Sequence, residues 1–274
     1  MKPILVPTDF SKCANNAMRY ALEIAERTGQ PITLLYVVYP TEGVDNNMYD
    51  AFFIDNYIQE RLDSMKVWAK KFAKSQRFKD IEINVDCQIG FPVSTIAQTA
   101  SNLGASLIVM GTTGASGLRG VLLGSVAGGV ISGSRVPVFV VPMKAVFRNN
   151  ARFAFATDFK LPVSRASLQT MRELLNLQHT GLNIVHVLGE KEPRPDKKTE
   201  DILSEKLGTI PHNFHYLHAK NIPQAIHNFI ESTDCNGLVA VSHEHSLLHK
   251  LFGKSISRSL AQHTKVPLLV LHDA

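Results

Sequence analysis

Residues 111–125 read GTTGASGLRGVLLGS and directly follow the apolar run 107–110. That run is typical of a buried strand, and the residues from Ser125 onward are typical of the start of a helix. Five glycines in the connection leave few Cβ atoms, so backbone N–H groups can approach a bound anion closely. Because a helix N-terminus favours negative charge, this strand, loop and helix together predict a phosphate-binding site.

The glycines match neither of the two common phosphate-binding patterns. A P-loop has Lys and then Ser or Thr after its last glycine, whereas Gly124 is followed by Ser125 and Val126. A dinucleotide fingerprint needs G-x-G-x-x-G, which the spacing from Gly111 to Gly114 excludes. The remaining pattern is G-x2-G-x9-G-S, formed by Gly111, Gly114, Gly124 and Ser125.

The chain repeats itself near its midpoint. The tripeptide Thr-Asp-Phe at residues 8–10 recurs at 157–159, 149 positions later, and segment 135–141 resembles segment 265–271. Thr-Gly precedes an apolar run at 28–29 and again at 180–181. Since 274 residues exceed the usual size of one domain, we expect two related domains, 1–145 and 151–274.

Each half alternates apolar runs of strand length with helix-periodic segments. This order predicts an α/β fold with two tandem five-stranded parallel sheets, each covered by helices on both faces. Ser11 is a suitable N-cap for the first helix and Gly29 a suitable stop. In the first half we expect strands at 3–7, 32–38, 81–88, 106–111 and 137–141, and helices at 11–28, 54–78, 93–103 and 125–133. In the second half we expect strands at 152–157, 182–188, 213–218, 237–241 and 267–271, and a helix at 199–207.

Ligands of open parallel sheets bind beyond the carboxyl ends of the strands, where the strand order reverses. In the first half these ends offer the carboxylate of Asp9, the apolar side chains Val37 and Met110, and the glycine loop. An adenine nucleotide would use all three. Two plainer interpretations stay open: Asp9 caps the first helix beside Ser11, and Val37 and Met110 are ordinary core residues.

These residues carry a family resemblance. The glycine pattern, the strand ending Pro7-Thr8-Asp9-Phe10-Ser11 and the closing segment 136–142 together resemble the universal stress protein family. The whole chain resembles the tandem form, closely in the first half and loosely in the second. The resemblance implies Rossmann-like domains of the adenine nucleotide alpha hydrolase-like type and pairing of the two domains through their last strands. Whether the chain also forms a homodimer stays open.

The resemblance also implies an ATP site in the first half, and Mg is a plausible companion of the phosphates. By matching positions, Asp9 lies at the adenosine end, Val37 touches the base, and Met110 and Gly111 line the pocket. The residues matched around the ribose and phosphates are Thr113, Gly114, Gly124, Ser125 and Val126. The full predicted set is Pro7, Thr8, Asp9, Val37, Met110, Gly111, Thr113, Gly114, Gly124, Ser125 and Val126.

The second half retains Thr157, Asp158 and Val187, but its loop at 242–255 has no glycine in place of Gly111 or Gly114. We therefore expect weak nucleotide binding there, or none. Gly-Lys-Ser at 253–255 lacks the earlier glycine of a P-loop. Three histidines at 243, 245 and 249 lack the spacing of a known metal motif, so we interpret them as a polar surface loop and expect no metal site.

Composition limits the partners. Lys and Arg total 29 against 24 Asp and Glu, a net charge of +5, and the one basic cluster, 66–79, is interpreted as a solvated helix face rather than a nucleic-acid site. Cys13, Cys87 and Cys235 are far apart and are expected to be reduced. The start MKPILVPTDF is not typical of a signal peptide, and no run approaches ~20 apolar residues. We expect a cytoplasmic protein without membrane or nucleic-acid contacts.

Three functions remain open. The first is an ATP-binding regulatory protein of the stress response. The second is a slow ATPase or nucleotidyl-transfer enzyme. For this function Arg119, within the glycine loop, is the one nearby cation that could act on the reacting phosphate. One arginine and one carboxylate do not make a catalytic set, so we assign no catalytic residue. The third is a nucleotide-free scaffold of paired domains.

The long connection 39–53 is interpreted as a lid over the site, a surface for a partner, or a segment that packs beside the core.

Overall fold

The computed structural model describes residues 1–40, 51–73, 75–113, 123–159, 165–176, 181–189, 192–242 and 266–272. The strands are β1 (Ile4–Pro7), β2 (Ile32–Val38), β3 (Ile83–Ile89), β4 (Leu107–Gly111), β5 (Val138–Val141), β6 (Phe153–Ala156), β7 (Leu182–Leu188), β8 (His212–His218), β9 (Gly237–Ser242) and β10 (Leu268–His272). The helices are α1 (Lys12–Thr28), α2 (Ala51–Ala73), α3 (Pro92–Asn102), α4 (Ser125–Gly133), α5 (Arg165–Asn176), α6 (Lys197–Leu207) and α7 (Ile222–Ser232).

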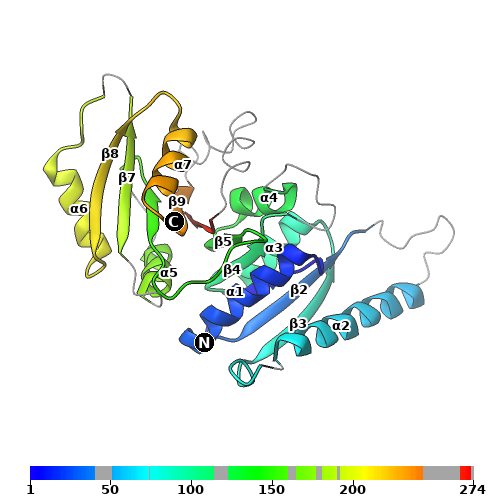
Figure 1. Cartoon of the computed structure of the whole chain (residues 1–274). Helices are drawn as coiled ribbons and strands as arrows, with labels where there is room; N and C mark the ends of the chain where they lie inside the picture. The colour runs from blue at the N-terminus through cyan, green and yellow to red at the C-terminus, as the bar shows by residue number, and fades with distance from the viewer. Residues whose placement is uncertain are drawn as a thin grey trace.

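All described strands belong to one sheet, in the order β3-β2-β1-β4-β5-β10-β9-β6-β7-β8 (Figure 1). Within each half the strands are parallel, which confirms the predicted fold class. The halves meet where β5 and β10 pair antiparallel, with Val138 opposite Val270 and Val140 opposite Leu268. The last strands therefore pair within the chain, and β3 and β8 form the edges of the sheet.

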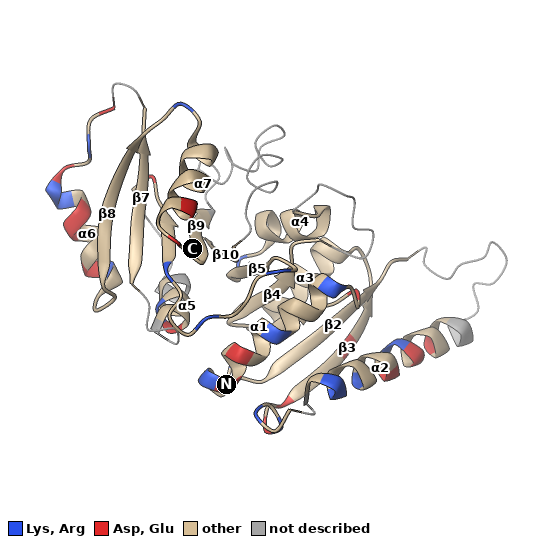
Figure 2. Cartoon of the chain, viewed as in Figure 1, with Lys and Arg blue, Asp and Glu red and all other residues tan. Residues whose placement is uncertain are grey.

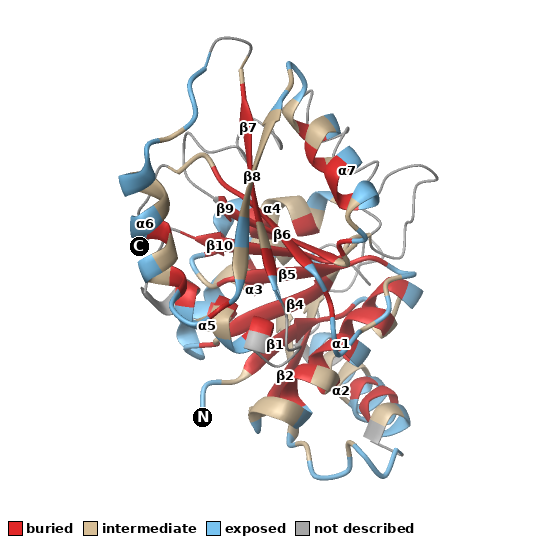
Figure 3. Ribbon diagram, turned by 60° about the vertical axis from the view of Figure 1, so that its left-hand side comes forward, coloured by how far each residue is buried: buried red, intermediate tan, exposed pale blue. Residues whose placement is uncertain are grey.

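Helices cover both faces of the sheet and bury two apolar cores. One core packs α1, α2, α5 and α6 against one face, and the other packs α3, α4 and α7 against the opposite face. Each core runs across the junction of the halves: Phe139 and Phe155 share the first, and Val140 and Val270 share the second. The buried strands and the exposed outer sides of the helices are distinguished by colour in Figure 3. The cores are thus organised by sheet face rather than by half.

Most predicted boundaries agree with the structure, and α2 is the main exception. Ser11 caps α1 by accepting from the N–H of Ala14 at 3.1 Å, and Gly29 ends it with a φ of 69°. The second helix was predicted at 54–78, but it ends at Ala73 and turns follow over 75–80. Phe72 and Phe78 both pack against the core, so the apolar periodicity continues past the end of the helix. Of segment 39–53, residues 41–50 lie outside the described residues.

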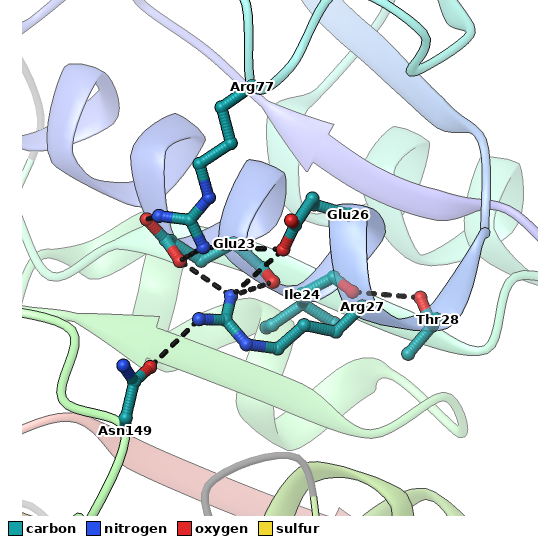
Figure 4. Close-up of polar contacts among 7 residues, drawn as sticks. All are labelled: Glu23, Ile24, Glu26, Arg27, Thr28, Arg77 and Asn149. Carbon is teal, nitrogen blue, oxygen red and sulfur yellow. Dashed lines mark hydrogen bonds and ion pairs between the residues drawn. The ribbon is translucent and has the colours of Figure 1, made fainter.

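The linker between the halves is attached to α1. The Nδ2 of Asn16 donates to the carbonyl oxygens of Pro142 and Ala145 at 2.8 and 2.9 Å. Arg27 donates to Asn149 at 2.8 Å and to Glu23 at 2.6 Å (Figure 4). Arg77, from the turn after α2, donates hydrogen bonds to both carboxylate oxygens of Glu23. One face of α1 thus holds both the α2–β3 connection and the linker.

Charged residues of both signs are interspersed along α2 (Figure 2). Lys66 pairs with Asp63 at 3.0 Å and Arg77 with Glu23 at 2.7 Å, so part of the basic cluster at 66–79 is neutralised locally. Lys70 and Lys71 are exposed. Among the helices described, none combines the length and the apolar character needed to span a bilayer.

His215 is expected to make stability depend on pH. Its Nε2 lies 3.0 Å from the side-chain oxygen of Asn183, its ring packs on Phe229, and burial lowers its pKa. The unfolded chain therefore takes up this proton at a higher pH, near 6.5, than the folded chain. Stability from this site is complete above about pH 6.5 and declines below it. In denaturant titrations at pH 7.5 and 5.5, His215→Gln should lose less stability than the wild type; an equal loss would contradict the assignment.

Candidate functional site

The strand order reverses between β1 and β4, and a cleft of about 320 Å³ opens at their carboxyl ends. The chain continues from β1 to β2 and β3 on one side, and from β4 to β5 on the other. The two connections leave in opposite directions, which is the usual origin of a ligand crevice in such sheets. The cleft is lined by Pro7, Thr8, Asp9, Ala14, Leu35, Tyr36, Val37, Tyr39, Pro92, Ile96, Met110, Gly111, Thr112, Thr113, Gly124, Ser125, Val126 and Ala127.

The structure brings all the described members of the predicted site into this one cleft. They are Pro7, Thr8, Asp9, Val37, Met110, Gly111, Thr113, Gly124, Ser125 and Val126. Gly114 and Arg119 lie outside the described residues. Assignment of these residues to a nucleotide remains a prediction.

The first wall is the turn from β1 into α1. Thr8 Oγ1 accepts from the N–H of Phe10 at 3.0 Å, and Asp9 Oδ1 accepts from the N–H of Ser11 at 3.0 Å. Phe10 has a φ of 60°, and Phe159 repeats that conformation at 58° in the second half. Because Ser11 is the cap of α1, Asp9 is not needed in that role. Its carboxylate instead braces the turn and lines the cleft.

The second wall begins at Gly111, where β4 meets α1 closely. A Cβ at this position would lie 2.9 Å from the Sγ of Cys13 and 3.0 Å from its backbone carbon. Such a contact is too short, so only glycine allows α1 to approach β4 here. The N–H of Gly124 donates to the carbonyl oxygen of Thr112 at 2.5 Å. This bond closes the two ends of the glycine loop and brings α4 to the cleft.

The N-terminus of α4 is suited to an anion. Gly124 is its N-cap and supplies no side-chain hydrogen bond, and the first turn has no acidic residue. The first N–H groups of a helix have no partner within the helix, and together they carry about half a positive charge. Ser125 is exposed at this end, and both Ser125 and Val126 line the cleft. This is the polar end of the cleft.

The cleft also has apolar lining residues, and the sequence predicted only some of them. Val37 and Met110 were predicted, whereas Tyr39, Pro92 and Ile96 were not. Pro92 and Ile96 begin α3, which follows the third strand and therefore also starts at the carboxyl edge of the sheet. The start of α3 just after a strand end was therefore a signal in the sequence that these residues could line the cleft. Tyr39 lies just beyond the carboxyl end of β2, so its position was also a signal for the cleft.

Charge in the described lining is slight. Asp9 is its one carboxylate, and neither Lys, Arg nor His is among the described lining residues. Metal-binding groups of three or more His, Cys, Asp or Glu are not found in the part of the chain that the structure describes. An anion in this cleft would therefore be held by backbone N–H groups, the α4 dipole and hydroxyls.

The second half repeats the β1 turn without the glycine loop. Thr157 Oγ1 accepts from the N–H of Phe159 at 3.0 Å, as Thr8 does in the first half. The position equivalent to Tyr36 is His186, which is buried and whose Nδ1 lies 2.7 Å from the carbonyl oxygen of Thr157. The loop after Ser242, with its three histidines and the Gly-Lys-Ser sequence, lies outside the described residues.

A larger groove of about 1080 Å³ lies between α1 and α2. Trp68, Phe72 and Arg61 are among its lining residues. Its described lining contains no glycine, and it comes mainly from α1 and α2 together with Phe10, Ser75 and Phe78. The smaller cleft at the reversal of strand order has the better chemistry for a ligand.

Comparison with known sequences matches the first half to one family. The sequence model described as the Universal stress protein family matches residues 1–142. Universal stress protein MJ0531 of Methanocaldococcus jannaschii is 33% identical over 147 residues, which cover 51% of this chain and 81% of the relative. Universal stress protein MJ0577 of the same organism is 28% identical over 155 residues, covering 52% and 96%.

Comparison with solved structures extends over both halves. A universal stress protein from Archaeoglobus fulgidus has a TM-score of 0.71 and 25% identity, covering 99% of this chain and 96% of that one. A putative universal stress protein from Pseudomonas aeruginosa shares the fold at a TM-score of 0.66 and 13% identity, covering 99% and 93%. The chain belongs to the universal stress protein family, in its tandem form.

Proposed function

We propose that the N-terminal half binds ATP in the cleft between β1 and β4, and that the chain acts in the cytoplasm as an ATP-dependent regulatory protein of the stress response. The observation that carries this proposal is the polarity of the cleft. Gly124 and Ser125 follow β4 and begin α4, whereas the apolar Val37 belongs to β2, which lies on the other side of β1 in the sheet. ATP has the same division between its phosphates and its base.

The residues fit the two ends of ATP. The phosphates would lie at the N-terminus of α4, where Gly124, Ser125 and Val126 offer N–H groups and a hydroxyl. The base would lie against Val37 and Met110, and Asp9 would accept from a ribose hydroxyl or a base amino group. Bound Mg would neutralise part of the phosphate charge, held by phosphate oxygens with help from Ser125 or Asp9. The described lining has no cation that could replace it.

Binding rather than turnover is what the described residues support. Phosphoryl transfer needs a base and a cation directed at the reacting phosphate. The described lining contains the carboxylate of Asp9 but neither Lys, Arg nor His. Asp9 is moreover engaged with the backbone of Ser11. We therefore propose an ATP-dependent change of state or partner, with hydrolysis slow or absent.

Isothermal titration with ATP and Mg tests the proposal. We expect saturable binding with about one ATP per chain, since the second half lacks the glycine loop. Asp9→Ala should weaken ATP binding about tenfold, because a hydrogen bond to a charged group is lost. Asp158→Ala, in the same Thr-Asp-Phe turn of the second half, is the matched control and should bind ATP as the wild type does. Absence of binding at millimolar ATP would overturn the proposal, and a stoichiometry of two would overturn the asymmetry.

A further inference from the structure

Two exposed aromatic residues contact each other at the cleft, and one of them lines it. Tyr39 follows β2 and Phe91 precedes α3, with ring centroids 5.4 Å apart and planes at 86°. Tyr39 is 43% exposed and Phe91 is 60% exposed. The N–H of Gly90 donates to the carbonyl oxygen of Val38 at 2.9 Å, which ties the two connections together just below the rings. The pair is therefore held in an edge-to-face arrangement while much of its apolar surface remains in water.

Tyr39 alone of the pair lines the cleft. It shares the apolar lining with Val37, Ile96 and Met110, and it follows β2, which lies across β1 from the strand β4 that leads to α4. Phe91 touches Tyr39 but is not among the lining residues. A planar ring entering this part of the cleft would cover exposed tyrosine surface, and Phe91 would restrict the directions in which Tyr39 can turn away. Every nucleobase has a face that stacks on an aromatic side chain.

We propose that Tyr39 stacks on the base of the bound nucleotide and that Phe91 is a positioning residue for Tyr39. This inference rests on the proposed function and adds a determinant of base preference to it. A purine covers more of the tyrosine ring than a pyrimidine does, so the contact favours ATP over CTP. The interaction involves the base alone and leaves the phosphate end unchanged.

Titration of ATP and CTP into the wild type, Tyr39→Ala and Tyr39→Phe tests the stacking. We expect Tyr39→Ala to weaken ATP binding about tenfold and to narrow the difference between ATP and CTP. Tyr39→Phe keeps the ring and should bind ATP within about twofold of the wild type. Leu103→Ala is the control: Leu103 is similarly exposed at 42%, lies at the far end of α3 and does not line the cleft, so binding should be unchanged.

A double-mutant cycle tests the role of Phe91. Phe91→Leu should weaken ATP binding in the wild type and have no further effect in Tyr39→Ala, because it acts through that ring. An equal loss in both backgrounds would overturn the positioning role. If the wild type binds ATP and Tyr39→Ala binds it equally well, the stacking inference fails while the proposed function stands. If the wild type binds neither nucleotide, both fail.

Discussion

Replacing Gly237 by valine is expected to lower the free energy of unfolding by about 3 kcal/mol, the upper part of the usual range for overpacked cores. Gly237 begins β9 and lies opposite Phe153 of β6. A Cβ at Gly237 would lie 2.2 Å from the Cε1 of Phe153 and 2.5 Å from its Cδ1. Phe153 is 4% exposed and belongs to the core on the face covered by α1, α2, α5 and α6, so its ring is surrounded by other buried side chains. Denaturant-induced unfolding measures the loss.

Gly181→Val is the matched control for this substitution. Gly181 precedes β7 in the same half, and a Cβ there would have its nearest neighbour at an ordinary 3.8 Å, the carbonyl oxygen of Pro211. Its stability should stay within about 0.5 kcal/mol of the wild type. Phe153→Leu should partly rescue Gly237→Val, because leucine lacks the ring atoms that obstruct the Cβ. Additive losses in the double variant would show that the ring is not the obstacle.

The contact of Gly237 with Phe153 also shows what sequence patterns leave out. Strands β2 and β7 were predicted with the bounds that the structure has, because each is an apolar run between turn residues. Register between strands is a different matter. Phe153 meets Gly237 across 84 positions of the chain, and no local pattern encodes that pairing. Periodicity similarly extended α2 beyond Ala73, since the turn after it also buries apolar side chains.

The residues of the site likewise divide into those that a local sequence pattern predicts and those that depend on the three-dimensional structure. Strand ends are recognisable in the sequence, which therefore predicts Asp9, Val37 and Met110 as neighbours, and the structure places them in one cleft. The exclusion of Asp9 from the cap of α1 required the geometry of the turn. The pairing of Tyr39 with Phe91 required it as well, because these residues belong to connections rather than to periodic elements.

The antiparallel junction bears on assembly. The sequence predicted that the last strands would pair, and β5 and β10 do so within one chain. Only a strand at the edge of a sheet has an unpaired side with which it can pair to another chain. Here β5 lies between β4 and β10, and β10 lies between β5 and β9. Any homodimer of this chain would therefore need another surface, such as the outer edges β3 and β8. His272 at the end of β10 lies 2.7 Å from the carbonyl oxygen of Ile131 in α4, so the helix at the cleft also contacts the second half.

Replacing Ser125 by aspartate is expected to weaken ATP binding about 100-fold while leaving the fold intact. Ser125 is the first residue of α4, is exposed and lines the polar end of the cleft. A carboxylate about 5 Å from a phosphate charge, at an effective dielectric constant of about 20, costs about 3 kcal/mol. The same carboxylate favours the helix N-terminus by about 0.5 kcal/mol, so thermal stability should be unchanged or slightly higher. Opposite signs for binding and stability separate this effect from misfolding.

Two controls locate the phosphates at α4. Ser125→Asn has nearly the same shape as Ser125→Asp without the charge, so it should bind ATP far better than the aspartate variant. Adenosine has no phosphate, so its affinity should be the same in Ser125→Asp and the wild type. The Tyr39→Ala variant should behave in the opposite way, because it removes a contact with the base and leaves the α4 end untouched. If Ser125→Asp binds ATP as tightly as the wild type in titration calorimetry, the phosphates do not lie at the N-terminus of α4, and the proposed orientation of ATP in the cleft is wrong.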